Sequence, residues 1–283
     1  MTTPYQQQPH VPQAPGRQLG TYTSPIAVRR ATFGDALASE WTKIRSVRST
    51  MWTLGVLIVL LVGLGLLIGF VVRSQDGHMG DTPVLSLGFY GVLLGLLCVI
   101  TLGVLTISSE YGTGMIRTTL TACPSRGRIL AAKSVVFFLL TFVIVAIATT
   151  LVAVVQASLV RNAPAPSGGE WLRATLGISL YVAMVGLLSL AVGALIRHSA
   201  GSITVMIGVV LLPLVLALFM FTDSLSGVRE FLLNYSIPSQ LGAFYGATVS
   251  DSGPSGWDPL WIMTGITAVA LGGAFLSLNS RDV

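Results

Sequence analysis

The sequence predicts an all-α polytopic membrane protein with six transmembrane helices, preceded by an amphipathic interfacial helix. Of its 283 residues, 53% are apolar and only 10% are charged, whereas soluble domains carry about 25% charged residues. The mean hydropathy is +0.80. A soluble chain of this length cannot bury so much apolar surface. The composition therefore excludes an ordinary soluble enzyme, a disordered protein and a disulfide-built secreted domain.

Two segments precede the first apolar run. Residues 1–31 are rich in Pro, Gln and Thr and have no apolar pattern, which predicts a disordered cytoplasmic tail. Residues 32–50 are different, because their apolar side chains recur every three or four positions, as expected for one face of a helix. These side chains are Phe33, Leu37, Trp41, Ile44 and Val47, with Met51 just beyond. Charged residues lie between them, so we expect an amphipathic helix in the membrane interface.

Six apolar runs are long enough to span about 30 Å of hydrocarbon. Within a membrane domain of residues 51–283, they cover approximately 52–72, 84–107, 134–160, 172–196, 202–221 and 259–278. The first run holds fifteen Leu, Ile, Val or Phe residues, which favours its insertion by about 5–9 kcal/mol. Pro213 is expected to bend the fifth span.

The distribution of positive charge predicts that both termini are cytoplasmic. With that orientation, twelve of the sixteen Lys and Arg residues lie inside, as the positive-inside rule requires. These are Arg17, Arg29, Arg30, Lys43, Arg45, Arg48, Arg117, Arg126, Arg128, Lys133, Arg197 and Arg281. Because the net charge of +5 follows the membrane in this way, it does not indicate nucleic-acid binding.

Two connecting segments are informative in this orientation. The inside loop 108–133 is basic and polar. The outside loop 222–258 contains an apolar stretch that is interrupted by Asn234, Ser236 and Pro238. That stretch is too broken to span a bilayer, so we expect short helices that lie at the outer surface or dip into it.

The sequence contains no recognisable catalytic or cofactor-binding motif. The three histidines, His10, His78 and His198, have no partner at metal-ligand spacing. Residues 127–134 nearly match a phosphate-binding loop, but Ala132 stands where the second glycine is needed. We therefore interpret Lys133 as an anchor at the start of the third span and predict no cofactor, metal or nucleotide site.

The middles of the six runs contain no charged residue. Proton- or ion-coupled carriers usually keep such a residue at mid-membrane. Its absence indicates that any energy for transport arrives from outside the membrane.

Two stretches resemble the membrane subunits of ABC transporters of type-2 permease architecture, the family of drug and antibiotic exporter-like permeases. The first is ASEWTKIRSVRSTMWTLGVL, residues 38–57, and the second is SSEYGTGMIRTTLTACPSRGRILAAK, residues 108–133. The family's acidic-aromatic-Lys pattern falls on Glu40, Trp41 and Lys43. Its acidic residue with a following Gly-Thr pair falls on Glu110, Gly112 and Thr113, and its basic stretch on Pro124, Ser125, Arg126 and Lys133. The resemblance covers residues 33–283.

The resemblance implies a permease subunit in a bacterial cytoplasmic membrane. A coupling helix in loop 108–133 would dock on a separate ABC ATPase subunit, and the interfacial helix would brace against the same partner. ATP hydrolysis would belong to that partner, so this chain would not itself be an enzyme. A second permease subunit, identical or a sister chain, would complete the exporter. The implied coupling residues are Glu40, Trp41, Lys43, Arg45, Glu110, Tyr111, Gly112, Thr113, Arg117, Arg126 and Lys133.

Residue chemistry agrees with such a role for loop 108–133. Gly112 and Gly114 permit a turn out of the bilayer, and Glu110 can accept bonds from backbone N–H groups or from an arginine of a partner. Together with the apolar spans, the resemblance implies an amphiphilic cargo, such as a drug, a peptide or a lipid-like molecule, passing between two protomers along the first, second and fifth spans. The alternatives are an ATP-independent carrier or channel and a non-transporting membrane regulatory subunit. A membrane enzyme is disfavoured because catalytic motifs are lacking.

Overall fold

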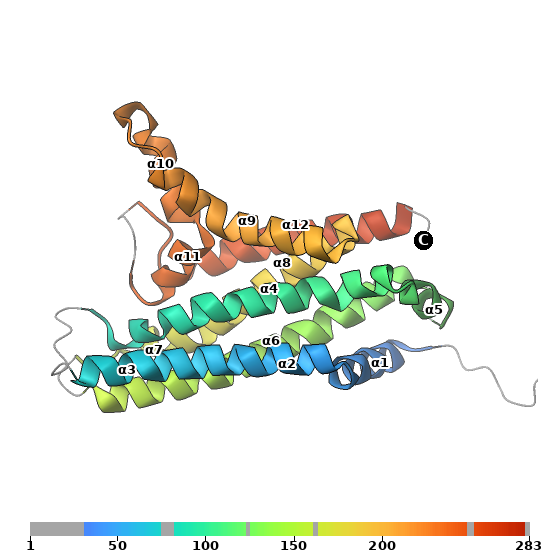
Figure 1. The fold of residues 1–283 in the computed structure, drawn as a ribbon, viewed down its shortest axis with the longest axis horizontal. Coiled ribbons are helices and arrows are strands. Elements are labelled where there is room, and N and C mark those ends of the chain that lie inside the picture. Colours follow the sequence, from blue (N-terminus) through green and yellow to red (C-terminus); the bar gives the residue numbers. More distant parts are fainter. Residues whose placement is uncertain (1–30, 75–81, 123–124, 161–163, 248–251, 281–283) are drawn as a thin grey trace, which may run out of the picture. The chain divides into compact units, whose positions relative to one another are not determined.

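The computed structural model describes residues 31–74, 82–122, 125–160, 164–247 and 252–280. The predicted disordered tail lies outside the described residues except for Ala31. In the described part of the chain every regular element is a helix (Figure 1). The predicted all-α class is thereby confirmed.

Six helical stretches are long and apolar enough to cross a membrane, as the sequence predicts. The first joins α2 (Arg48–Ile58), a π-helical turn η1 (Val59–Leu64) and α3 (Gly65–Ser74); the second joins η2 (Val84–Gly88) and α4 (Phe89–Gly112); the third is α6 (Arg126–Leu159). The fourth joins α7 (Gly168–Leu172), a second π-helical turn η3 (Arg173–Gly177) and α8 (Ile178–Ile196); the fifth is α9 (Ser199–Leu218); the sixth is α12 (Asp258–Ser280).

The helix of the third span begins well before the apolar run from which the span is predicted. Hydropathy places the start of this span at residue 134, whereas α6 begins at Arg126. Because hydropathy detects only the apolar section, it misses a polar first two turns that are still helical. In α9, Pro213 lies inside a continuous helix.

Helix α8 forms the centre of the bundle. It packs against α4, α6, α9 and α12. The fourth span, to which α8 belongs, is 78% buried, compared with 22% for the fifth span and 17% for the sixth. Glycine allows the closest of these approaches, because a Cβ atom at Gly103 of α4 would lie 2.4 Å from the carbonyl oxygen of Gly186 in α8. The exposed apolar faces of the outer spans are suited to lipid or to another membrane subunit.

Four shorter helices complete the fold. α1 (Phe33–Ser46) and α5 (Met115–Ala122) lie near the same end of the bundle, and α3 and α7 lie near the other end (Figure 1). The region 222–258, described up to residue 247 and again from residue 252, holds a 3-10 turn η4 (Asp223–Leu225), α10 (Ser226–Tyr235) and α11 (Ile237–Phe244). α10 is largely exposed, whereas α11 is almost wholly buried.

Candidate coupling site

The candidate site begins with α1, whose start is fixed by its own sequence. Thr32 caps the helix, and its hydroxyl accepts a bond from the Asp35 N–H at 3.3 Å, while the Asp35 carboxylate accepts from the Thr32 N–H at 2.8 Å. This reciprocal capping box satisfies two donors that a helix start leaves unpaired. The helix ends at Val47, whose extended backbone (φ −85°, ψ 111°) separates α1 from the first span. α1 is therefore an independent helix joined to the span by one hinge residue.

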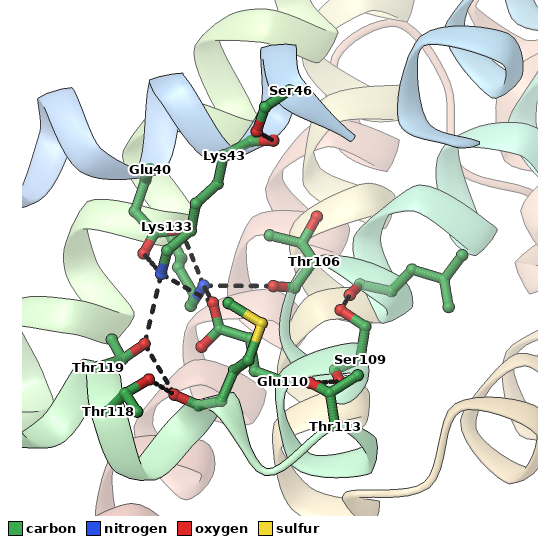
Figure 2. Close-up of polar contacts among 12 residues, drawn as sticks. Glu40, Lys43, Ser46, Thr106, Ser109, Glu110, Thr113, Thr118, Thr119 and Lys133 are labelled. Atoms are coloured by element: carbon green, nitrogen blue, oxygen red, sulfur yellow. Dashed lines mark hydrogen bonds and ion pairs between the residues drawn. The ribbon is translucent and has the colours of Figure 1, made fainter. Parts of the chain in front are cut away.

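Four charged side chains from three helices form a closed ring, hereafter the charge ring (Figure 2). The ammonium of Lys43 in α1 donates to Glu40 Oε1 at 2.8 Å and to Glu110 Oε1 at 2.9 Å. The ammonium of Lys133 in α6 donates to Glu40 Oε2 at 2.8 Å and to Glu110 Oε1 at 2.7 Å. Each carboxylate thus contacts both lysines. The ring ties α1 to the end of α4 and to the start of α6.

The charge ring is buried and neutral. Glu40, Glu110 and Lys133 have side chains that are 6%, 7% and 1% exposed, and only Lys43 reaches the surface. Two positive and two negative charges cancel, which is the condition under which buried ions are tolerated. Removal of one member of a buried ion pair typically costs about 3–5 kcal/mol, because the remaining charge is left without compensation. The ring therefore resists any motion that separates its three helices.

The two lysines use their donors fully. Lys133 adds a 3.3 Å bond to the carbonyl oxygen of Thr106, and Lys43 adds a 3.5 Å bond to the hydroxyl of Thr119 in α5. Partial burial lowers the pKa of Lys43, but the hydrogen bonds and charges of Glu40 and Glu110 outweigh it and raise that pKa above its ordinary value. Lys43 therefore stays charged throughout the physiological pH range.

The roles expected for Lys133 and Glu110 need correction. Lys133 is an interior ion-pair partner and not an anchor facing the cytoplasm, because it lies on the same face of α6 as the buried Leu130 and Phe137. Glu110 pairs with Lys43 and Lys133 of its own chain, a pairing that the sequence analysis did not anticipate. Its second oxygen, Oε2, is buried and has no donor in the described part of the chain.

Helix α5 follows the ring and presents an exposed polar surface. Gly114 makes the turn into α5 with a positive φ of +72°, which is accessible to glycine without strain. Gly112, by contrast, is the last residue of α4 and needs no special conformation. Ile116 anchors α5 inward, whereas Arg117, Thr118 and Thr121 are exposed. The helix is therefore held on one side and free on the other.

The other residues implied by the resemblance divide into exposed and half-buried groups. Trp41 and Arg45 of α1 are exposed, as are Gly112 and Thr113 at the end of α4. Thr113 bonds through its hydroxyl to the carbonyl oxygen of Ser109 at 2.8 Å. Trp41, Arg45, Thr113 and Arg117 are thus exposed on helices that contribute to, or directly follow, the charge ring.

Tyr111 and Arg126 belong to a second contact beside the ring. The guanidinium of Arg197, at the end of α8, lies 5.0 Å from the centre of the Tyr111 ring, a cation–π arrangement. Arg126 donates to the carbonyl oxygen of Leu278 near the end of α12. These contacts link α4, α6, α8 and α12. Sequence reasoning missed Arg197, whose αL conformation (φ 59°) at a helix end gives no sequence signal.

No group of three or more His, Cys, Asp or Glu side chains that could hold a metal ion occurs among the residues that the structure describes. The site consists of buried ion pairs, the short helix α5 and the helix α1, which the charge ring ties to α4 and α6.

The fold and this site define a multi-pass helical membrane protein whose bundle carries a braced helical appendage at one end. A family model described as ABC-2 family transporter protein matches residues 36–224. This range covers well over half of the chain, including most of α1, the charge ring and five of the six spans. The chain therefore belongs to the ABC-2 transporter family of membrane permeases. A comparison with curated proteins found no match.

Proposed function

We propose that this chain is the permease subunit of an ATP-driven exporter, which moves an amphiphilic cargo across the bacterial cytoplasmic membrane. A separate ABC ATPase would supply the energy, and this chain would not hydrolyse ATP. Membership of the ABC-2 family supports the general role. The observation that carries the coupling mechanism is the charge ring, which joins α1 rigidly to both spans that flank α5.

In this proposal, α5 is the coupling helix and the exposed residues of α1 complete the docking surface. A displacement of α5 by the ATPase reaches α4 directly through Gly114. It also reaches the charge ring through the contact between Thr119 and Lys43. Because separation of buried opposite charges is costly, α1, α4 and α6 move together. The ATPase needs different contacts in its two nucleotide states to drive such a change.

The proposed orientation places α1, α5 and both termini in the cytoplasm. Positive charge supports it, since Lys43, Arg45, Arg117, Arg126 and Arg128 all lie at or beside the α1–α5 end. Positively charged residues concentrate on the cytoplasmic side of membrane proteins. The ATPase would then meet α5 and α1 where ATP is available.

A second permease, identical or a sister chain, is part of the proposal. The first and fifth spans bury only 22% of their windows within this chain, whereas the second span buries 61%. The sixth span buries still less, 17%, so the first, fifth and sixth spans have the larger free faces for contact with another protomer. A path between such apolar faces favours an amphiphilic cargo, such as a drug, a peptide or a lipid-like molecule.

The experiment compares Arg117→Glu with Arg73→Glu in the tagged full-length chain, purified gently from its native membrane. Both residues are exposed arginines, but Arg117 lies on α5 and Arg73 at the opposite end of the bundle. We expect a stoichiometric ATPase subunit to co-purify with the wild type and with Arg73→Glu, and to be lost with Arg117→Glu.

Two outcomes would contradict the proposal. A six-span protein that never co-purifies with an ATPase, even after crosslinking, and still transports cargo in vesicles without ATP would be a carrier or channel. A chain that binds the ATPase but moves no cargo after reconstitution would be a regulatory membrane subunit.

A further inference from the structure

We infer that this chain carries a binding site for a compact apolar cation, at the end of the bundle opposite the charge ring. A pocket of about 380 Å³ lies between the start of the second span, the segment before α7 and the end of α11. This volume falls within the range of small-molecule sites, about 300–1,000 Å³. The site lies within one protomer and does not depend on coupling to an ATPase.

The walls of the pocket are rigid and mostly apolar. Pro83, Pro164 and Pro166 contribute three proline rings, and Phe244 and Tyr245 contribute aromatic side chains. Both aromatic residues are almost fully buried and belong to or follow α11. Rigid rings bind an apolar body with little loss of side-chain freedom.

Glu170 gives the pocket its charge. It is the one residue with a formal charge at neutral pH among the described residues that line the pocket. Its Oε2 accepts from the Ser167 N–H at 2.6 Å in the capping box of α7, which leaves Oε1 to accept from a ligand. In the described part of the chain no lysine or arginine forms an ion pair with Glu170. Glu170 is therefore the group in the pocket that would attract a ligand ammonium.

A second, smaller cavity adjoins the pocket. This second cavity, of about 10 Å³, shares Leu85, Ala174 and Tyr245 with the pocket, and its size is about that of one water molecule. Gln156 lines it and is fully buried. The amide nitrogen of Gln156 donates to the Gly65 carbonyl oxygen at 2.8 Å, but its Oε1 has no donor among the described residues. A buried acceptor without a donor is unusual and calls for one.

Gly88 keeps the smaller cavity open. A Cβ atom at Gly88 would lie 3.2 Å from the Tyr245 hydroxyl oxygen and 3.9 Å from Gln156 Oε1, so only glycine leaves that space free. Both π-helical turns border the cavity, through Leu61 of η1 and Ala174 of η3. Such turns occur frequently at functional sites. The apolar rings and the single carboxylate of the pocket itself select a ligand with an apolar body and one positive charge.

The probe is tritiated adamantan-1-amine, a compact hydrocarbon cage with one ammonium. Equilibrium binding is measured on the full-length chain in phosphatidylcholine nanodiscs. Glu170→Gln removes the charge while glutamine still completes the capping box. Ala165→Trp fills the pocket from an exposed loop position. Asp223→Asn is the matched control, an exposed acid outside the pocket.

We expect saturable binding to the wild type and to Asp223→Asn, at least tenfold weaker binding to Glu170→Gln, and none to Ala165→Trp. Neutral adamantan-1-ol should bind wild type and Glu170→Gln equally. Two results would show that the amine only partitions into the bilayer, and would overturn the inference. One is binding that never saturates, and the other is equal binding to Ala165→Trp and to the wild type. Equal affinity of the amine for wild type and Glu170→Gln would overturn it as well.

Discussion

The ammonium of Lys133 lies 2.8 Å from Oε2 of Glu40, although 93 residues separate the two along the chain. This contact joins the interfacial helix α1 to the third span. Because of this contact, α1 is fixed to the helix bundle. With Lys43 and Glu110 it forms a ring in which every charge has two opposite neighbours.

Loss of Lys133 should destabilise the fold strongly. Lys133→Met keeps the length of the side chain but leaves two buried carboxylates with one partly exposed lysine. We expect the free energy of unfolding to fall by about 3–5 kcal/mol, measured by denaturant unfolding in mixed micelles. Adding Glu110→Gln should recover part of the loss, since it removes the uncompensated charge. A single variant as stable as the wild type would show that the ring contributes nothing.

Exchange of two charges should fail to restore the ring. In an isolated ion pair, Glu110→Lys combined with Lys133→Glu would rebuild the pair with inverted polarity. In the ring, the new ammonium would face Lys43 and the new carboxylate would face Glu40, so like charges would repel. We therefore expect the exchange variant to melt well below the wild type in fluorescence-detected size-exclusion chromatography. An exchange variant that melts at the wild-type temperature would show that Glu110 and Lys133 act as an isolated pair, independent of Glu40 and Lys43.

The contact between α4 and α8 should not tolerate a methyl group. At Gly103, the Cβ atom of Gly103→Ala would lie 2.4 Å from the Gly186 carbonyl oxygen, so the backbones must separate. We expect a loss of about 1–3 kcal/mol, read from the same unfolding assay. Gly265→Ala in α12 is the control, because nothing lies within 4 Å of its Cβ position. The control should be neutral or gain about 0.5–1 kcal/mol from its better helix propensity.

Two glycines two residues apart should respond differently to alanine. Gly114 has a φ of +72°, a conformation that costs a residue with a Cβ atom about 1–2 kcal/mol. Gly114→Ala should therefore displace α5 and lower the stimulation of ATPase activity by this subunit. Gly112→Ala, at a helical position with open space around it, should leave stimulation unchanged. Equal stimulation by both variants would contradict the role of this turn.

The sequence predicted the fold well because the relevant signal is local. Long apolar runs identify membrane spans whatever they pack against, and the three- and four-residue spacing of residues 32–50 identified an amphipathic helix. The helix is shorter than that segment, because the backbone at Val47 is extended and ends α1 before the first span. Nothing in the neighbouring side chains signals that break.

The arrangement of the site was only partly predictable. Glu40 and Lys43 are three residues apart on one helix, so their pairing could be anticipated. Their contacts with Glu110 and Lys133 depend on how α1, α4 and α6 pack, which periodicity does not specify. For the same reason Lys133 was interpreted as a surface anchor, although the buried positions around it on α6 show the contrary.

Site-specific photo-crosslinking tests the central claim, that α5 docks on an ATPase, most directly. A benzophenone amino acid is placed at Thr118, on the exposed face of α5, or at Phe70, on an exposed face near the opposite end of the bundle. After irradiation of native membranes, the crosslinked partner is identified by mass spectrometry. The account predicts a soluble ATPase with a phosphate-binding loop from position 118 and none from position 70. Absence of such a partner from position 118, with the protein fully active in transport, would contradict it.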